Sequence, residues 1–225
     1  MMDPRGMGGY DRIATMFSPD GRIHQIEYAR EAVKRGSIVL AARNHKGLVM
    51  LSELKHSNPL FEYNDKIFQV DEFIFCAYSG LLSDSRVLID QARVEAQIQR
   101  IYYNEEPNLD VLAWKISSIF QKVTQYGGRP FGVSLLFAGF DHDGPSLHLI
   151  EPSGAKFTVN AIAIGRKEDD ATDLLKEKYN PDASLAEMKE MLLDIYEKVL
   201  EGKEPAEILL IDQEKRKIKK ERVNL

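Results

Sequence analysis

The segment "YDRIATMFSPDGRIHQIEYAREAVKRG", residues 10–36, comes before the first stretch that is typical of a β-strand. Its "SPDG", residues 18–21, favours a type I turn, with proline second and glycine fourth. A helix is expected at about residues 22–35, because apolar residues recur on one face: Ile26, Ala29 and Val33. Gly36 is a natural position for that helix to end. Chain termini are commonly loose, so a terminal segment with a defined turn and helix indicates a function.

Length and composition predict one domain with an ordinary core. The chain has 225 residues, of which 44% are hydrophobic, so residues 1–225 are interpreted as a single domain. The net charge of −5 argues against nonspecific binding to nucleic acid, which needs a basic surface. No apolar run approaches the ~20 residues of a membrane span. We therefore expect no nucleic-acid or membrane partner.

Cysteine and histidine usage limits the chemistry and the location. Cys76 is the single cysteine, so no internal disulfide is possible, and an inert buried thiol in a cytoplasmic protein is expected. Residues 1–9 have no hydrophobic region, so we expect no signal peptide. The five histidines do not fall at metal-ligand spacing, and no phosphate-binding glycine motif is present. The expectation is therefore no metal and no cofactor.

Runs of strands alternate with runs of helices, which predicts a layered α+β fold with two covered sheets. The expected strands are 37–43, 48–53, 66–70, 73–80, 132–140, 146–152, 156–165 and 206–212. The expected helices after the first are 83–102, 109–126, 169–179 and 185–200. The helix at 83–102 is expected to bury one apolar face, made of Val87, Val94, Ile98 and Ile101. Residues 212–225 are interpreted as a charged C-terminal tail.

Five sequence segments carry a resemblance to a known family. They are the opening segment through Ser37, "NDKIFQV", "YSGLLSDSRVLIDQARVEAQ", "TQYGGRPFGVSLLFAGFD" and "AIAIG". In this order and spacing the chain resembles the α-type subunits of the proteasome core particle, especially the archaeal kind. The resemblance implies the four-layer αββα sandwich of N-terminal nucleophile hydrolases, with an extra N-terminal helix at 22–35. It covers nearly the whole chain.

The resemblance implies a non-catalytic subunit in a protease. Seven such subunits would form an outer ring that gates substrate entry, docks the C-termini of activating ATPases and supports assembly of the catalytic β ring. The implied partners are further α subunits, β subunits, a regulatory ATPase ring and unfolded proteins in transit. The helix at 22–35 would lie across one mouth of the sandwich and dock beside its neighbour's helix.

An alternative hypothesis is a catalytic subunit that matures at Ser37. The resemblance places the nucleophile position at Ser37, with Glu53 and Lys66 at the positions of its partners. That mechanism needs a free α-amine on the nucleophile. Because Ser37 follows 36 residues that are themselves specified, we expect no cleavage before it and no catalytic residue. A third hypothesis is an assembly paralogue that never joins a protease.

Family positions also predict two functional sites. The gate residues implied by the resemblance are Tyr10, Asp11, Arg12, Pro19 and Tyr28, behind a mobile gate tail at 1–9. The activator-binding pocket is implied to contain Lys66, Glu27, Gly80 and Leu81. In this pocket the ammonium would receive a terminal carboxylate.

Two segments depart from the family pattern. "YGGRPFG", residues 126–132, is one residue shorter before Arg129, and "AIGRK" has Arg166-Lys167 where two small residues are usual. No contact of either segment is carried over from the family.

Overall fold

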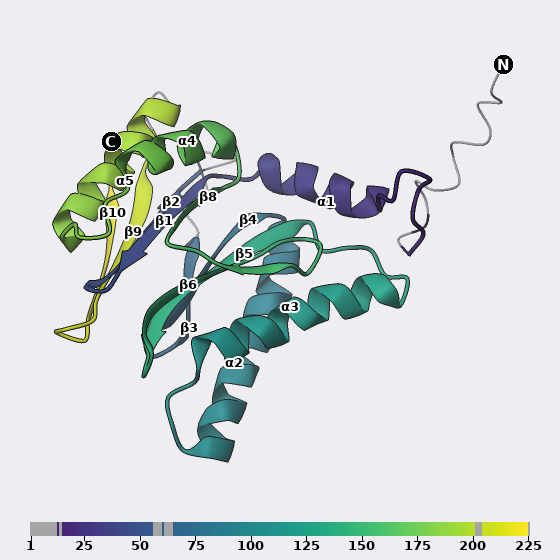
Figure 1. Ribbon diagram of the computed structural model, residues 1–225, viewed down its shortest axis with the longest axis horizontal. Coiled ribbons are helices and arrows are strands. Elements are labelled where there is room, and N and C mark those ends of the chain that lie inside the picture. The colour runs from purple at the N-terminus through teal and green to yellow at the C-terminus, as the bar shows by residue number, and fades with distance from the viewer. Residues whose placement is uncertain (1–12, 14, 56–59, 61–64, 201–203, 225) are drawn as a thin grey trace.

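The chain folds into four layers (Figure 1). The computed structural model describes residues 13, 15–55, 60, 65–200 and 204–224. Two five-stranded antiparallel sheets pack face to face, and a pair of helices covers the outer face of each. This arrangement confirms the predicted αββα sandwich. Among the described helices, none combines the length and the apolar character that a membrane crossing requires.

The first sheet has the strand order β10-β9-β2-β1-β8, and the second has β3-β4-β5-β6-β7. The strands of the first are β10 (Lys217–Val223), β9 (Ala206–Asp212), β2 (Gly47–Glu53), β1 (Val39–Asn44) and β8 (Ala161–Ile164). Those of the second are β3 (Ile67–Asp71), β4 (Ile74–Gly80), β5 (Val133–Asp141), β6 (Gly144–Ile150) and β7 (Lys156–Thr158). The helices are α1 (His24–Lys34), α2 (Leu82–Tyr103), α3 (Leu109–Gln125), α4 (Glu168–Lys178) and α5 (Leu185–Leu200).

Both faces of each sheet are buried, which explains why the strands are apolar at nearly every position. Along β1, Val39 and Ala41 face the second sheet, whereas Leu40 and Ala42 face α4 and α5. Strand β5 alternates in the same way between the second helix pair and the space between the sheets. The chain therefore has three apolar layers, each between two layers of secondary structure.

The predicted buried face of α2 is wrong. Val87, Val94 and Ile101 are 63%, 49% and 79% exposed, respectively. The helix instead buries the neighbouring stripe, which includes Leu88, Ile89, Ala92 and Ala96. This stripe combines large and small apolar residues and packs against the second sheet, whereas the predicted stripe lies on the outer face. Periodicity alone did not distinguish the two stripes.

The last two strand assignments also differ from the sequence analysis. Residues 156–165, predicted as one strand, form β7 and β8, which belong to different sheets. Residues 217–223, described only as part of a charged tail, form β10 and pair with β9. Strand β10 is an edge strand, and its charged residues protect the open edge, so its pattern does not resemble that of a buried strand.

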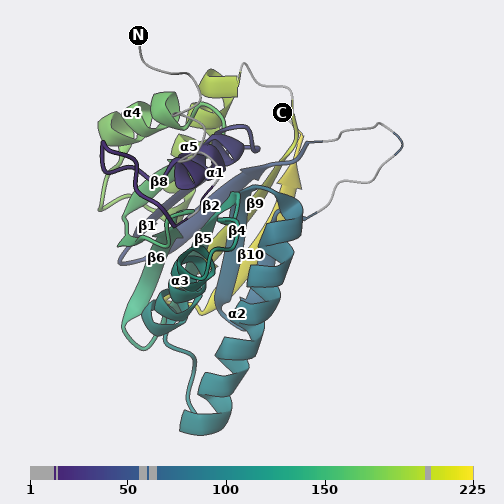
Figure 2. The ribbon, with the colours of Figure 1, turned by 90° about the vertical axis from the view of Figure 1, so that its right-hand side faces the viewer.

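A hydrogen-bonded turn leads into α1. Gly21 N donates to Ser18 O at 2.9 Å, as the predicted turn requires. Arg22 N donates to Ser18 Oγ at 3.2 Å, and Ser18 N donates to Arg22 O at 2.8 Å. Because Arg22 is part of this turn, the helix begins at His24, two residues later than expected. Helix α1 then packs on β4 and β5, and Figure 2 views it nearly along its axis.

Gly36 is required by a close approach of two segments. A Cβ atom at this position would lie 2.3 Å from Ser79 Oγ and 2.4 Å from Gly80 N. The chain therefore passes directly over the end of β4 between α1 and β1. Gly36 therefore does more than end the helix. A larger residue at this position would collide with the end of β4.

We predict that Gly36→Ala destabilises the protein by roughly 2–4 kcal/mol, because the end of β4 must shift to admit the methyl group. Denaturant unfolding followed by circular dichroism measures the change. Arg35→Ala, at the exposed neighbouring position, is the control and should cost about 0.5 kcal/mol or less. Equal stability of the two variants would contradict the close approach.

Candidate functional site

Ser37 lies where α1, β1 and β4 meet. Its carbonyl oxygen is 3.0 Å from Ser79 Oγ, which is also 3.1 Å from Val33 O in the last turn of α1. Ala29 and Val33 of α1 are buried against the sheets, as the sequence predicted. The helix directly before Ser37 is therefore part of the folded core, and the nitrogen of Ser37 is an amide of the continuous chain.

Glu53 is a completely buried carboxylate close to Ser37. Its Oε2 accepts a hydrogen bond from Ile38 N at 3.2 Å and one from Arg166 Nε at 3.0 Å. A second guanidinium nitrogen of Arg166 binds Oε1, so the contact has two points. Arg166 is one of the residues that depart from the family pattern. Sequence reasoning missed its role, and the departure itself was the available signal.

Lys66 is 9% exposed and lies beside the first residue of β3. Its Nζ lies 3.6 Å from the centre of the Tyr78 ring, a cation–π contact. Within the described ranges, no hydrogen bond or ion pair reaches this Nζ. Burial lowers the pKa of Lys66 to about 8, and the negative charges of Glu53 and Glu207 oppose that shift. The side chain is thus a buried cation without a directly bound counter-ion in the described part of the chain.

The predicted catalytic partners do not form a working set. The carboxylate of Glu53 is bound by Arg166, and the ammonium of Lys66 lies on Tyr78. Ser37 lacks the α-amine that would accept its proton. This geometry disfavours maturation at Ser37.

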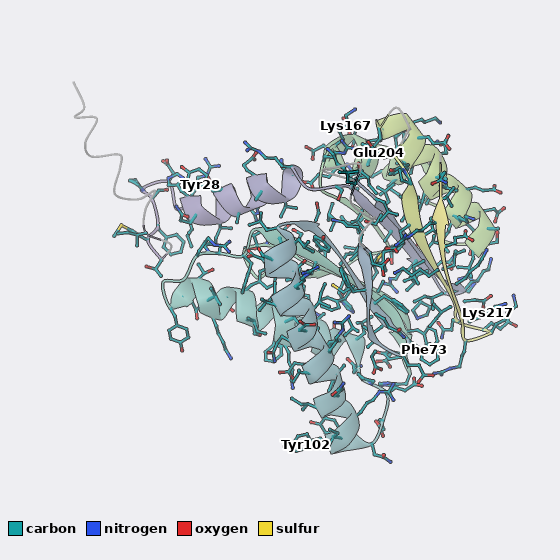
Figure 3. The ribbon with its side chains drawn as sticks, turned by 180° about the vertical axis from the view of Figure 1, so that it is seen from behind. Tyr28, Phe73, Tyr102, Lys167, Glu204 and Lys217 are labelled. Carbon is teal, nitrogen blue, oxygen red and sulfur yellow. The ribbon has the colours of Figure 1, made fainter. Side chains whose placement is uncertain are left out.

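The predicted pocket residues are only partly brought together within one chain. Leu81 and Tyr28 line one surface hollow with Glu31, Ala32 and Arg35. Figure 3 shows Tyr28 projecting from α1, and its side chain is exposed. This hollow places one predicted pocket residue and one predicted gate residue side by side.

The other predicted pocket residues have contacts of their own. Glu27 Oε1 accepts a hydrogen bond from Arg22 Nε at 2.5 Å. Gly80 has a φ of 113°, and a Cβ there would lie 2.2 Å from Gly132 O, so the fold itself requires glycine. Lys66 directly precedes β3, whose Ile67 pairs with Ala77 of β4, and Gly80 is the last residue of β4. Lys66 and Glu27 are not hydrogen-bonded or ion-paired to each other in the described structure.

Most of the predicted gate lies outside the described residues, including Tyr10, Asp11, Arg12 and the tail at 1–9. Pro19 occupies the turn that precedes α1. Tyr28 stacks on His24, with ring centres 6.5 Å apart. The gate assignment therefore stays a prediction.

The shortened loop at residues 126–132 is anchored by Asp84. The guanidinium of Arg129 donates two hydrogen bonds to the Asp84 carboxylate, at 2.8 and 2.9 Å. Gly132 N donates a third, at 2.9 Å. Because Asp84 is in the first turn of α2, these bonds tie the loop to the helix that follows Leu81.

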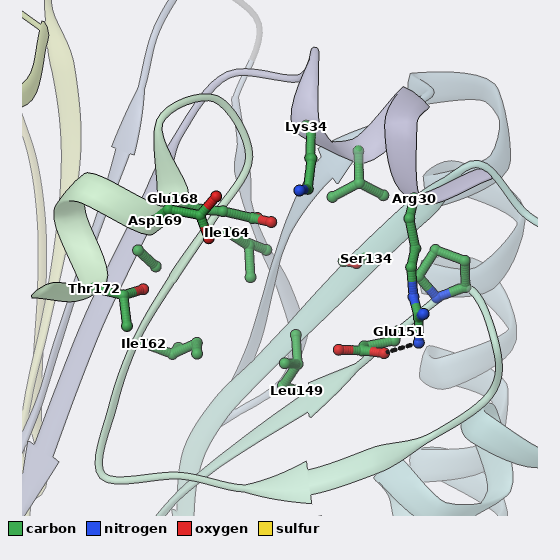
Figure 4. Close-up of a pocket in the computed structure, with 13 residues that line it drawn as sticks. Arg30, Lys34, Ser134, Leu149, Glu151, Ile162, Ile164, Glu168, Asp169 and Thr172 are labelled. Carbon is green, nitrogen blue, oxygen red and sulfur yellow. Dashed lines mark hydrogen bonds and ion pairs between the residues drawn. The ribbon is translucent and has the colours of Figure 1, made fainter. Parts of the chain in front are cut away.

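A second hollow lies on the other side of α1, between β6, β8 and α4 (Figure 4). Its floor is apolar, and Arg30 on its rim donates to Glu151 at 2.8 Å. Burial raises the pKa of Glu168, which faces this hollow and accepts a hydrogen bond from Gly165 N. Charges of both signs line the hollow: Arg30 and Lys34 of α1, Glu151, and Glu168 with Asp169 of α4.

One cluster of possible metal ligands occurs in the described part of the chain, at Asp141, His142 and Asp143. The Asp141 carboxylate already accepts hydrogen bonds from Leu109 N at 2.8 Å and from Asp143 N at 2.9 Å. These bonds hold the β5–β6 turn against α3. A structural role accounts for the cluster.

Comparisons with known proteins give consistent matches. A family model for proteasome subunits matches residues 33–207, and a model for the N-terminal signature of A-type proteasome subunits matches residues 10–32. The proteasome alpha subunit of Methanothermobacter thermautotrophicus is 42% identical over 97% of this chain and 91% of that protein. That of Thermococcus sibiricus is 43% identical over 94% and 83%, and that of Archaeoglobus fulgidus is 47% identical over 78% and 72%.

We predict that Arg166→Met destabilises the protein by about 2 kcal/mol, because it leaves the buried Glu53 carboxylate without its cation. The free energy of unfolding in denaturant measures this loss. Adding Glu53→Gln to Arg166→Met should recover part of it, because the double variant contains no unpaired charge. A single variant as stable as the parent would contradict the pairing.

Proposed function

The chain belongs to the family of proteasome α-type subunits, and from this premise we propose that it forms the gated outer ring of a proteasome core particle. Members of this family are non-catalytic subunits of the threonine protease complex, which cuts with its β subunits. The proposed ring has seven copies of α-type subunits, caps the β ring in the cytoplasm and supports its assembly. Unfolded proteins would pass through it.

The observation that carries the proposal is Lys66, a largely buried residue whose ammonium has no directly bound counter-ion among the described residues. A lysine that is 9% exposed and has no directly bound counter-ion among the described residues loses hydration without a compensating ion pair. A carboxylate that enters from outside would supply the missing charge. This supports a docking site for the C-terminal carboxylate of an activating ATPase, at the boundary between adjacent subunits.

The surroundings of Leu81 support the same site. Leu81 is 44% exposed and lines a hollow with Tyr28 and Ala32 of α1. An apolar side chain near the end of an activator tail would have a surface to bury there. Because this hollow includes residues of α1, tail binding would act directly on the helix that follows the proposed gate.

The position of α1 supports ring formation and gating. The helix packs on β4 and β5 with its inner face and leaves Tyr28 exposed, so its outer face is open to a neighbour. A head-to-tail contact between copies of one chain closes into a ring when the rotation allows it. In that ring the segments before α1 of all subunits would converge on the axial pore.

We predict that Lys66→Ala abolishes stimulation of peptide hydrolysis by an activating ATPase ring, because the docked carboxylate loses its cation. The assembled core particle is assayed with and without the ATPase, and native mass spectrometry checks assembly. Lys122→Ala, at an exposed lysine of α3, is the control and should leave stimulation unchanged. Full stimulation of the Lys66 variant would refute the docking site.

We predict that deleting residues 1–12 raises basal peptide hydrolysis severalfold, because the proposed plug and gate residues are removed together. Hydrolysis of a short fluorogenic peptide by the assembled particle, without activator, measures the effect. Deleting residues 1–4 alone keeps Tyr10, Asp11 and Arg12 and should have a smaller effect. Unchanged basal hydrolysis in the longer deletion would rule out the plug.

A further inference from the structure

The backbone that carries Lys66 is held by a carboxylate from the other sheet. Glu207, in β9, is 1% exposed, and its Oε2 accepts hydrogen bonds from Lys66 N at 3.0 Å and Ile67 N at 2.8 Å. Strand β3 is an edge strand of the described sheet, so among the described strands none pairs with these two N–H groups. Glu207 satisfies both of them and joins the two sheets at this edge.

The C-terminal strand completes this connection. Lys220 Nζ, from β10, lies 3.0 Å from Glu207 Oε1 and donates to Ile67 O at 2.8 Å. The same ammonium lies 3.4 Å from Asp65, which also binds Arg222 at 2.8 Å. The start of β3 is thus held on both sides of Lys66 by the β9–β10 hairpin.

Charged and titratable groups face Lys66 from several elements. Glu53 of β2 and Glu207 of β9 are the carboxylates whose charges raise its pKa, against the larger effect of burial. Tyr78 of β4 lies against its Nζ. Glu53 is bound to Arg166, and Glu207 is bound to Lys220, so both carboxylates are held by other cations. They favour the charged form of Lys66 without occupying its ammonium.

We propose that Glu207 is a positioning residue for activator docking, which orients the Lys66 backbone and keeps its ammonium charged but free for an incoming carboxylate. This inference rests on the proposed function of Lys66. It adds that the C-terminal hairpin, through Glu207 and Lys220, controls the state of the docking lysine. Glu207 does not touch the activator.

A purely structural role of Glu207 makes a different prediction. If it only joined the sheets, its loss would lower stability and leave the pH dependence of activator stimulation in the assembled particle unchanged. The two roles are therefore separated by whether the pH at which stimulation is lost shifts together with the pH at which Lys66 titrates. The Lys66 ammonium is charged below its pKa of about 8, so docking of a carboxylate should be lost as the pH rises through that value.

The experiment measures the titration of Lys66 in the assembled particle, by competitive acetylation over a pH series and mass spectrometry of the Lys66 peptide. In Glu207→Gln the pH midpoint of the Lys66 titration should fall by about one unit, because the variant lacks a negative charge that favours the ammonium form. A synthetic peptide copied from the C-terminus of a partner ATPase should stimulate peptide hydrolysis by the parent particle. In the Glu207→Gln particle this stimulation should be lost at a correspondingly lower pH. The same peptide with an amidated C-terminus should not stimulate.

Glu221→Gln is the matched control, because Glu221 lies in β10 and pairs with Lys189 and Lys219. In this control, the midpoint of the Lys66 titration should equal that of the parent protein. If Glu207→Gln does not assemble, Lys220→Met is the alternative test. This variant leaves the Glu207 charge uncompensated, so the midpoint of the Lys66 titration should rise. An unchanged midpoint in the Glu207 variant, or an equal shift in the control, overturns the inference.

If Lys66→Ala retains full stimulation, the docking site is wrong, whatever the acetylation midpoints show. If Lys66→Ala abolishes stimulation but the Glu207 variant titrates like the parent, only the positioning role is wrong.

Discussion

The buried hydroxyl of Ser79 determines how α1 joins the sandwich. It lies within hydrogen-bond distance of two carbonyl oxygens, Val33 O at the end of α1 and Ser37 O before β1. Gly36 and Gly165 both pass so near this oxygen that a Cβ at either position would lie 2.5 Å or less from it. The helix, the first strand and the segment after β8 therefore meet around one atom. The direction of α1 depends on this contact.

The same junction explains why a fold related to hydrolases performs no hydrolysis here. The peptide bond before Ser37 is part of the packed connection, so its nitrogen is not available as a base. Arg166 binds the carboxylate of Glu53, and the ammonium of Lys66 lies on the Tyr78 ring with no directly bound counter-ion among the described residues. The charges of a catalytic set are present, but each is held by a partner other than Ser37. The proposed docking of a carboxylate on Lys66 would use one of these charges for binding.

Much of the architecture could be predicted from local patterns. Strands that are apolar on both faces predicted covered sheets, and the SPDG turn predicted the start of the N-terminal helix within two residues. The buried stripe of α2 could not be predicted, because the helix has two apolar stripes of similar period. Only the packed structure shows that the stripe with Ala92 and Ala96 faces the sheet. Strand β10 was missed because an edge strand is charged. Arg166 and Glu207 were missed as partners because 113 and 141 residues separate them from Glu53 and Lys66, respectively.

The sequence by itself determined the alternation of strand runs with helix runs, the turn before α1 and the family, since these depend on neighbouring residues and on a specific N-terminal segment. It did not separate β7 from β8 or reveal β10. Only the tertiary structure decided which charges meet. Glu53 binds Arg166, Glu207 binds the backbone of Lys66, and the ammonium of Lys66 lies on Tyr78. The physical reason is that a buried charge is stabilised by whichever partner the packing of the two sheets brings within a few ångströms. Sequence spacing contains no information about that distance.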